Sequence, residues 1–141
     1  MKEMQMEKMP LPQPVRIKKR RCFLRATHNG KKFIAKTMIL QTVAQTKTQG
    51  MRLGFTVTKK VGHAVVRNRV RRRLKEAARF VLPVNGLNGF DYVIIGRKEA
   101  DEVPFEVLKR DLAYLLGLFK KRLSEEKEID KNAETDSELL S

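Results

Sequence analysis

The pattern of apolar and polar residues along the chain predicts a domain that mixes strands and helices. Residues 51–58 alternate strictly, with Met51, Leu53, Phe55 and Val57 on one face, as in a half-buried strand. Residues 33–43 are rich in β-branched and apolar residues and predict a second strand. The polar linker between them, residues 44–50, ends in a glycine and suits a hairpin loop. Residues 92–96 form a short apolar run, typical of a strand buried on both faces.

Three helices are expected around these strands. Residues 16–27 are weakly helical and end before Asn29 and Gly30, and residues 64–82 predict a longer helix that Pro83 ends. Pro104 suits the first position of a last helix. Apolar residues recur there at three- and four-residue spacing, at Phe105, Leu108, Leu112, Leu115, Phe119 and Leu123. The order helix, strand, strand, helix, strand, helix predicts a sheet of three or four strands with helices packed against it.

Charge divides the 141 residues into three parts. The chain has 31 Lys and Arg against 16 Asp and Glu, a net charge of +15. Residues 1–15 are neutral and contain three prolines, residues 124–141 carry a net −5, and residues 16–123 therefore carry +20. We expect a disordered extension over residues 1–15, one folded domain over residues 16–123, and an acidic disordered tail over residues 124–141. So large a positive excess implies a polyanionic partner, either nucleic acid or an anionic membrane surface.

Several classes of protein are disfavoured by composition. No apolar run approaches the ~18 residues that span a bilayer, and the N-terminus lacks the apolar core of a signal peptide, so no membrane association is expected. The single Cys22 allows no intramolecular disulfide and no multi-cysteine zinc site, and we interpret it as a packed or idle residue. These features favour a cytoplasmic protein.

Five arginines in seven positions, residues 67–73, form the strongest chemical signal in the sequence. On a helical wheel, one narrow arc is apolar and is formed by Val66, Val70, Leu74, Ala77 and Val81. The opposite face is cationic and is formed by Asn68, Arg71, Arg72, Lys75 and Arg79, while Arg67, Arg69 and Arg73 flank the apolar arc. One side of this helix is therefore suited to a core and the rest to a polyanion.

The guanidinium group grips phosphate with two hydrogen bonds, and eight basic residues between Lys59 and Lys75 could hold several phosphates at once. An ordinary solvated helix face is the simplest alternative, but only Glu76 on this helix could pair with these cations. A nuclear localisation signal and a DNA-reading helix are two further alternatives. Composition alone therefore indicates a polyanion-binding helix and does not separate RNA from DNA.

Catalytic groups of a protein nuclease are scarce. A two-metal nuclease needs converging carboxylates, yet Glu76 is the only acid between Arg16 and Phe90. A metal-free nuclease could use two histidines as acid and base, but His28 and His63 have no evident orienting carboxylate in the sequence. We therefore expect no catalytic residue in the chain itself.

Residues 52–73, RLGFTVTKKVGHAVVRNRVRRR, closely resemble the signature of the bacterial ribonuclease P protein component, in which a strand, a basic pair and a glycine precede an R-N-R helix. Residues 91–98, DYVIIGRK, resemble the strand that follows. The resemblance implies an α+β fold: a two-layer α/β sandwich with a small mixed sheet and a left-handed βαβ crossover, similar to ribosomal protein S5 domain 2. It also implies a subunit that binds a catalytic RNA and the 5′ leader of precursor tRNA, so that an endoribonuclease removes the leader while the RNA carries the chemistry.

The resemblance further implies which residues contact RNA. Those facing the RNA subunit would be Arg67, Asn68, Arg69, Arg71, Arg72, Arg73 and Lys75. Those facing the leader would be Phe23, Lys36, Arg52, Lys59 and Lys60. Mg²⁺ would be held mainly by RNA, with Asn68 near a bound ion. Thr27 and Gln41 stand where many members have aromatics, which weakens the expectation of base stacking. A structural RNA-binding protein of ribosomal type, or a self-sufficient nuclease, are the alternative functions.

Overall fold

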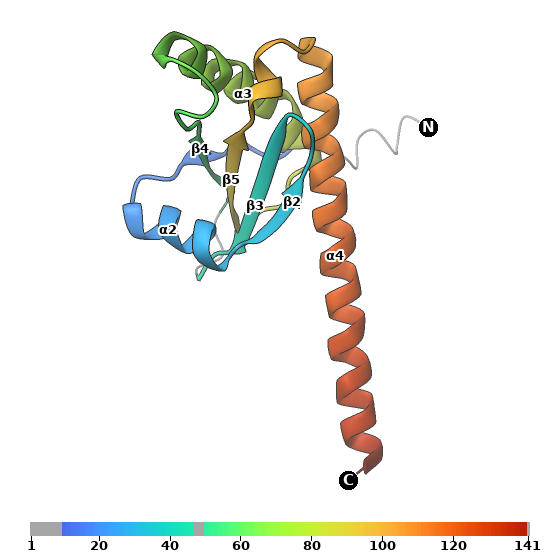
Figure 1. The fold of residues 1–141 in the computed structure, drawn as a ribbon. Coiled ribbons are helices and arrows are strands. Elements are labelled where there is room, and N and C mark those ends of the chain that lie inside the picture. The colour runs from blue at the N-terminus through green and yellow to red at the C-terminus, as the bar shows by residue number, and fades with distance from the viewer. Residues whose placement is uncertain (1–9, 47–49, 141) are drawn as a thin grey trace.

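The fold is taken from a computed structural model that describes residues 10–46 and 50–140, with side chains through Glu128 (Figure 1). Within these ranges the elements are, in order, β1 (Val15–Arg16), α2 (Arg20–Asn29), β2 (Lys31–Ile34), β3 (Met38–Ala44), β4 (Arg52–Thr56), α3 (Ala64–Asn85), β5 (Phe90–Gly96), the 3₁₀-helix η1 (Lys98–Asp101) and α4 (Phe105–Leu140). No described helix carries an apolar stretch long enough to cross a bilayer. The predicted mixture of strands and helices is confirmed.

The strands form one mixed sheet in the order β1-β4-β5-β3-β2. Strand β5 is central, parallel to β4 and antiparallel to β3, and α3 connects β4 to β5. This arrangement confirms the predicted sandwich around a β-α-β unit. The left-handedness of its crossover stays a prediction. The expected hairpin between residues 33–43 and 51–58 is wrong, because β5 lies between β3 and β4. A local loop signal cannot reveal a strand that arrives later in the chain.

The expected single strand over residues 33–43 is in fact two strands. The chain turns back between β2 and β3, where the Ala35 amide donates to the Met38 carbonyl at 2.9 Å. Thr37 in this turn is buried, and its hydroxyl donates to Asp111 of α4 at 2.7 Å. A tertiary contact with α4 therefore fixes a turn that the local sequence of residues 33–43, which contains no glycine or proline, does not predict.

The two faces of the sheet bury different helices, which lie on opposite sides in Figure 1. One face presents Leu40, Tyr92 and Ile94 to α3 and α4, and together they form the main core. The other face presents Val93, which packs with Ala26 of α2 and with Ile17. As predicted, Leu108, Leu112, Leu115 and Phe119 of α4 are fully buried, and Phe105 and Leu123 are half-buried.

Helix α3 passes through Pro83 and ends at Asn85, so the predicted end at residue 82 is too early. Pro83 has no amide hydrogen, and the Arg79 carbonyl consequently lacks its usual helical donor. The Gln13 side chain supplies a donor instead, at 3.0 Å from that carbonyl. The Leu11 amide donates to the Pro83 carbonyl at 2.7 Å. The proline thus binds the N-terminal segment instead of ending the helix.

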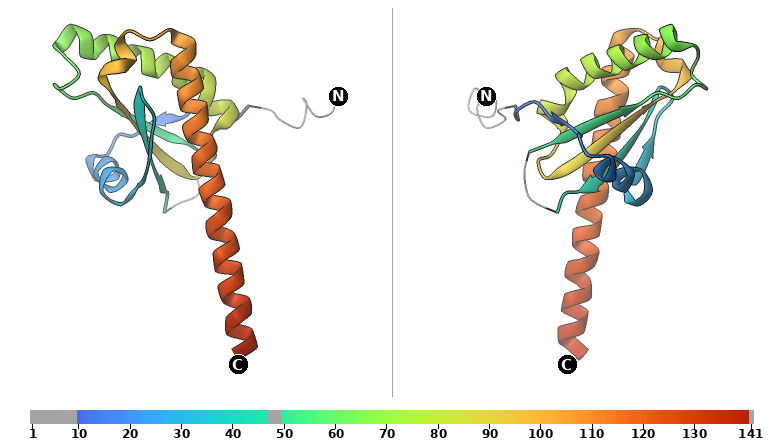
Figure 2. Two further views of the ribbon diagram at one scale, coloured as in Figure 1. Left: turned by 45° about the vertical axis from the view of Figure 1, so that its right-hand side comes forward. Right: turned by 90° about the vertical axis from the view of Figure 1, so that its left-hand side faces the viewer.

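Both ends of the chain differ from the expected boundaries. The N-terminal segment joins the domain at Leu11 rather than at residue 16, while residues 1–9 lie outside the described part. At the other end, residues 124–140 continue α4, which extends well beyond the sheet in both views of Figure 2. Glu, Lys, Ala and Leu are good helix formers, and no glycine or proline follows Gly117. Glu126 accepts an ion pair from Lys31 of β2, which holds this part of α4 to the sheet.

Tyr92 gives the core a measurable signature at alkaline pH. Burial raises its pKa from 10.0 to about 12, and its hydroxyl exchanges hydrogen bonds with the Leu87 backbone at 2.8 and 2.9 Å. Because the unfolded chain loses this proton first, stability is complete below pH 10 and should fall by roughly 2–3 kcal/mol between pH 10 and 12. Tyrosinate absorbance should therefore show one late component among the two tyrosines, which Tyr92→Phe removes. A single early transition of both tyrosines in the folded protein would contradict this prediction.

Candidate nucleic-acid interface

Helix α3 carries its basic residues on the side away from the core. Val70, Leu74, Ala77 and Val81 are buried as predicted, together with Ala78 and Leu82, which the predicted arc omitted. The burial of this stripe leaves Asn68, Arg72 and Lys75 exposed, with Arg67 and Arg71 half-buried. The Arg71 side chain donates to Asn68 Oδ1 at 3.3 Å, so these two residues share one surface.

Two of the predicted RNA-facing arginines are instead engaged within the protein. Arg69 makes two hydrogen bonds to the Asp101 carboxylate, at 2.6 and 2.8 Å. Arg73 donates to the Val103 carbonyl. Both residues lie on the edge of α3 that faces η1. The cations of α3 therefore form two sets, one turned to solvent and one bound to the loop that follows β5.

The outward cations border an open groove with a volume of about 450 Å³. Arg71, Lys75 and Arg79 of α3 form one wall, and Phe23 of α2 lies in the groove as well. Ala78 of α3 also lines the groove, and the remaining lining comes from β4 and the N-terminal segment, at Gln13, Pro14, Arg16, Ile17, Leu53, Gly54 and Phe55. Gly54 makes the close approach possible, since a Cβ there would lie 3.0 Å from the Phe23 ring. Phe23 and the basic helix thus meet in one groove.

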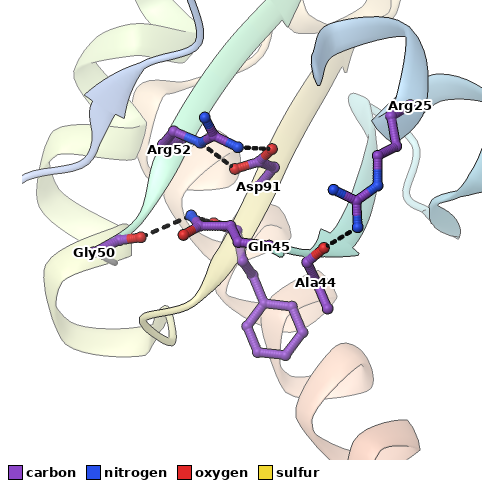
Figure 3. A network of polar contacts seen from close by, with 7 residues as sticks. Arg25, Ala44, Gln45, Gly50, Arg52 and Asp91 are labelled. Atoms are coloured by element: carbon purple, nitrogen blue, oxygen red, sulfur yellow. Dashed lines mark hydrogen bonds and ion pairs between the residues drawn. The ribbon is translucent and has the colours of Figure 1, made fainter. Parts of the chain in front are cut away.

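A second groove is lined by residues of α2 and by Arg52, and Figure 3 shows the polar contacts of Arg25 and Arg52. Its lining is Lys19, Arg21, Cys22, Arg25, Gln45, Thr46 and Arg52. Arg52 makes a two-pronged pair with Asp91, at 2.7 Å for both bonds, and Asp91 is 1% exposed. The hydrogen bond from Asp91 raises the pKa of Arg52, so the guanidinium stays charged. Arg25 donates to the Ala44 carbonyl at 2.6 Å. Arg52 therefore neutralises a buried carboxylate and also borders the groove.

The three predicted leader-facing lysines are not beside these grooves. Arg52 lies at the end of the sheet where it pairs in register with Asp91, and Phe23 packs beside Gly54, two residues further along β4. Lys36 is in the turn before Met38, at the opposite end, where Met38 pairs with Gly96. Lys59 and Lys60 follow β4 in the same direction and are exposed. The structure thus divides the five predicted residues into two groups.

Several groove residues were not predicted from the sequence. Lys19, Arg21 and Arg25 of the second groove belong to the basic run at the start of α2, and the clustering of Lys18, Lys19, Arg20 and Arg21 was the available signal. No sequence signal indicated that Gln13 and Arg16 would line the first groove. Their position depends on how the N-terminal segment docks at the end of α3.

A model of the family described as Ribonuclease P matches residues 11–120. The chain belongs to the ribonuclease P protein family. The ribonuclease P protein component of Paramagnetospirillum magneticum is 48% identical over 101 residues, covering 69% of this chain and 76% of the relative. That of Gluconacetobacter diazotrophicus is 47% identical over 97 residues, covering 69% and 84%. Membership of this family implies that the chain is the protein component of an endoribonuclease that acts in tRNA processing.

Solved ribonuclease P proteins share the fold. The protein from Staphylococcus aureus superposes with a TM-score of 0.63 at 26% identity, covering 77% of this chain and 97% of that structure. The protein from Thermotoga maritima superposes with a TM-score of 0.60 at 28% identity, covering 72% and 94%. The resemblance drawn from residues 52–73 is thereby confirmed.

Thr27 and Gln41 stand at the two positions where the family resemblance led us to look for aromatic residues. The Thr27 hydroxyl donates to the Leu24 carbonyl within α2, at 2.9 Å. Gln41 is 2% exposed on the face of the sheet that α2 covers, and its Oε1 has no hydrogen-bond partner in the described part. Neither side chain can stack on a base, so the aromatic residues that line the first groove are Phe23 and Phe55.

The described residues contain no cluster of three His, Cys, Asp or Glu that could hold a metal ion. Asn68 lies among arginines, and its Oδ1 already accepts a hydrogen bond from Arg71. Mg²⁺ prefers carboxylate or phosphate oxygens, and the surroundings of Asn68 offer neither. His28 lies in α2 and His63 directly precedes α3; both are exposed, and no described carboxylate bonds to them.

Proposed function

We propose that this ribonuclease P protein binds the catalytic RNA subunit through the outward cations of α3 and the 5′ leader of precursor tRNA through the grooves beside α2. In this role it promotes endonucleolytic removal of the leader, which gives the mature 5′ end of the tRNA. The RNA subunit carries the chemistry, and Mg²⁺ is held mainly by RNA. The working place of such an assembly is the cytoplasm.

The first groove is the observation that carries this proposal. It brings Phe23, which can stack on a base, next to Arg71 and Lys75, which can bind phosphates. A single-stranded leader needs both kinds of contact, and a double-stranded or folded RNA subunit needs the exposed cations further along α3. One surface can therefore hold two RNAs side by side and neutralise the repulsion between them, which is a contribution of binding and positioning.

Reconstitution tests the proposal. We expect precursor tRNA to be cleaved by the RNA subunit at a low Mg²⁺ concentration only when the protein is added, because the cations of the protein replace part of the counter-ion atmosphere. The protein alone should cleave nothing. The measurement is the appearance of the 5′ leader on a denaturing gel across a Mg²⁺ titration, with each component omitted in turn.

Two outcomes would favour other functions. Leader release by protein alone, in the presence of a chelator-treated buffer or of Mg²⁺, would indicate a self-sufficient nuclease. Binding to RNA without any effect on the RNA-catalysed reaction would indicate a structural RNA-binding protein of ribosomal type.

A further inference from the structure

Arg69, the second arginine of the R-N-R sequence, is paired with a carboxylate of the same chain. One edge of its guanidinium, formed by Nε and Nη2, donates to Asp101 at 2.6 and 2.8 Å. The Arg69 side chain is 43% exposed and that of Asp101 is 14% exposed, so the pair lies at the surface that α3 presents. A two-pronged bond of this kind is also how a guanidinium binds a phosphate.

The fold places Asp101 opposite Arg69. Strand β5 ends at Gly96, where a Cβ would lie 2.9 Å from both Val70 and Leu74 of α3, so strand and helix approach closely. The chain turns at once into η1, whose Ala100 is fully buried. Arg73 holds the far side of this loop through the Val103 carbonyl. Asp101 is thus fixed on both sides.

The electrostatics favour a closed pair at neutral pH. The hydrogen bond from Arg69 lowers the pKa of Asp101, so the carboxylate stays ionised. The same bond raises the pKa of Arg69. A phosphate can form a two-pronged bond with the Nε–Nη2 edge of Arg69 only by displacing this carboxylate. A phosphate at the remaining donors of Arg69 is repelled by the same nearby anion.

We propose that Asp101 is an internal competitor for RNA phosphate, which withholds Arg69 from unrelated RNA and thereby sharpens the discrimination for the cognate RNA subunit. The inference rests on the proposed function, since it concerns the same RNA-binding surface. Binding to unrelated RNA depends almost wholly on the number of phosphates that cations neutralise. Each cation that is paired within the protein lowers the affinity for unrelated RNA. The cognate RNA also gains affinity from its shape and from its contacts with the grooves.

The test compares Asp101→Asn with Glu99→Gln, which removes the same charge from an exposed residue of η1 that has no described partner. The probes are a single-stranded oligouridylate and the ribonuclease P RNA subunit, titrated from 50 to 200 mM salt. For oligouridylate, Asp101→Asn should steepen the slope of log affinity against log salt by about 0.7. Between 50 and 200 mM salt, the variant should therefore lose roughly threefold more affinity than the unaltered protein. Adding Arg69→Gln to Asp101→Asn should cancel the steepening. The ratio of cognate to unrelated affinity should fall about threefold in Asp101→Asn.

Equal slopes for Asp101→Asn and Glu99→Gln would overturn the proposal, and so would weaker binding of oligouridylate by a folded Asp101→Asn. Thermal unfolding is measured for each variant, with Asp101→Ser as a second neutral replacement. If neither variant folds, Asp101 is a structural residue and the proposal is overturned. If the unaltered protein shows no salt-dependent RNA binding, the proposed function itself fails, which is a separate result.

Discussion

Arg52→Ala is expected to destabilise the domain by about 3–5 kcal/mol, because it leaves the carboxylate of Asp91 buried without a counter-charge. Asp91 is 1% exposed, and both of its oxygens accept from Arg52 at 2.7 Å. Without the arginine, the Asp91 carboxylate stays buried in the sheet with no positive group to pair with it. The measurement is urea unfolding followed by circular dichroism, with the free energy of unfolding extrapolated to water.

Two further variants separate this mechanism from a general loss of charge. Arg21→Ala removes an exposed cation from the same groove and should change the free energy of unfolding by less than about 1 kcal/mol. Arg52→Met combined with Asp91→Leu replaces both partners with apolar side chains and should recover most of the lost stability. If Arg52→Ala were no more harmful than Arg21→Ala, the pair would not be the structural contact that its burial indicates.

The parts of the fold that follow from a local repeat could be predicted from the sequence. The buried stripe of α3 depends on one helical period, and Val70, Leu74 and Ala77 are buried accordingly. Strand β5 was recognised as a strand buried on both faces because the apolar run 92–96 is uninterrupted. The errors occur where a distant part of the chain decides. Pro83 stays inside a helix because Gln13 supplies the missing donor, and no periodicity of residues 64–82 contains that information.

The candidate site shows the same division. Residue type and spacing in α3 predicted which side chains turn outward, and Arg72 and Lys75 do so. The two arginine–carboxylate pairs join residues 39 and 32 positions apart, Arg52 with Asp91 and Arg69 with Asp101. Family resemblance assigns RNA contacts by position in a motif. It cannot reveal that one of the motif arginines, Arg69, is bound by Asp101 of the same chain.

The double variant Arg71→Ala, Arg72→Ala is expected to weaken binding to the RNA subunit about 10- to 100-fold near physiological salt. Arg72 is exposed and Arg71 borders the first groove, and no described carboxylate pairs with either of them. Each can therefore form charge-assisted hydrogen bonds to a phosphate. Loss of two phosphate contacts should also make the slope of log affinity against log salt shallower by about 1.4–1.8. Filter binding of labelled RNA subunit between 50 and 400 mM salt measures both quantities.

The matched control is Lys121→Ala with Lys127→Ala, which removes the same two charges from exposed positions on α4. Because these lysines lie on another helix, away from both grooves, this variant should retain nearly all of the affinity and nearly the same slope. Neither double variant touches the buried stripe of α3, so both should unfold at the temperature of the unaltered protein. If the two pairs weakened binding equally, affinity would depend on net charge alone, and the outward face of α3 would not be the surface that recognises the RNA subunit.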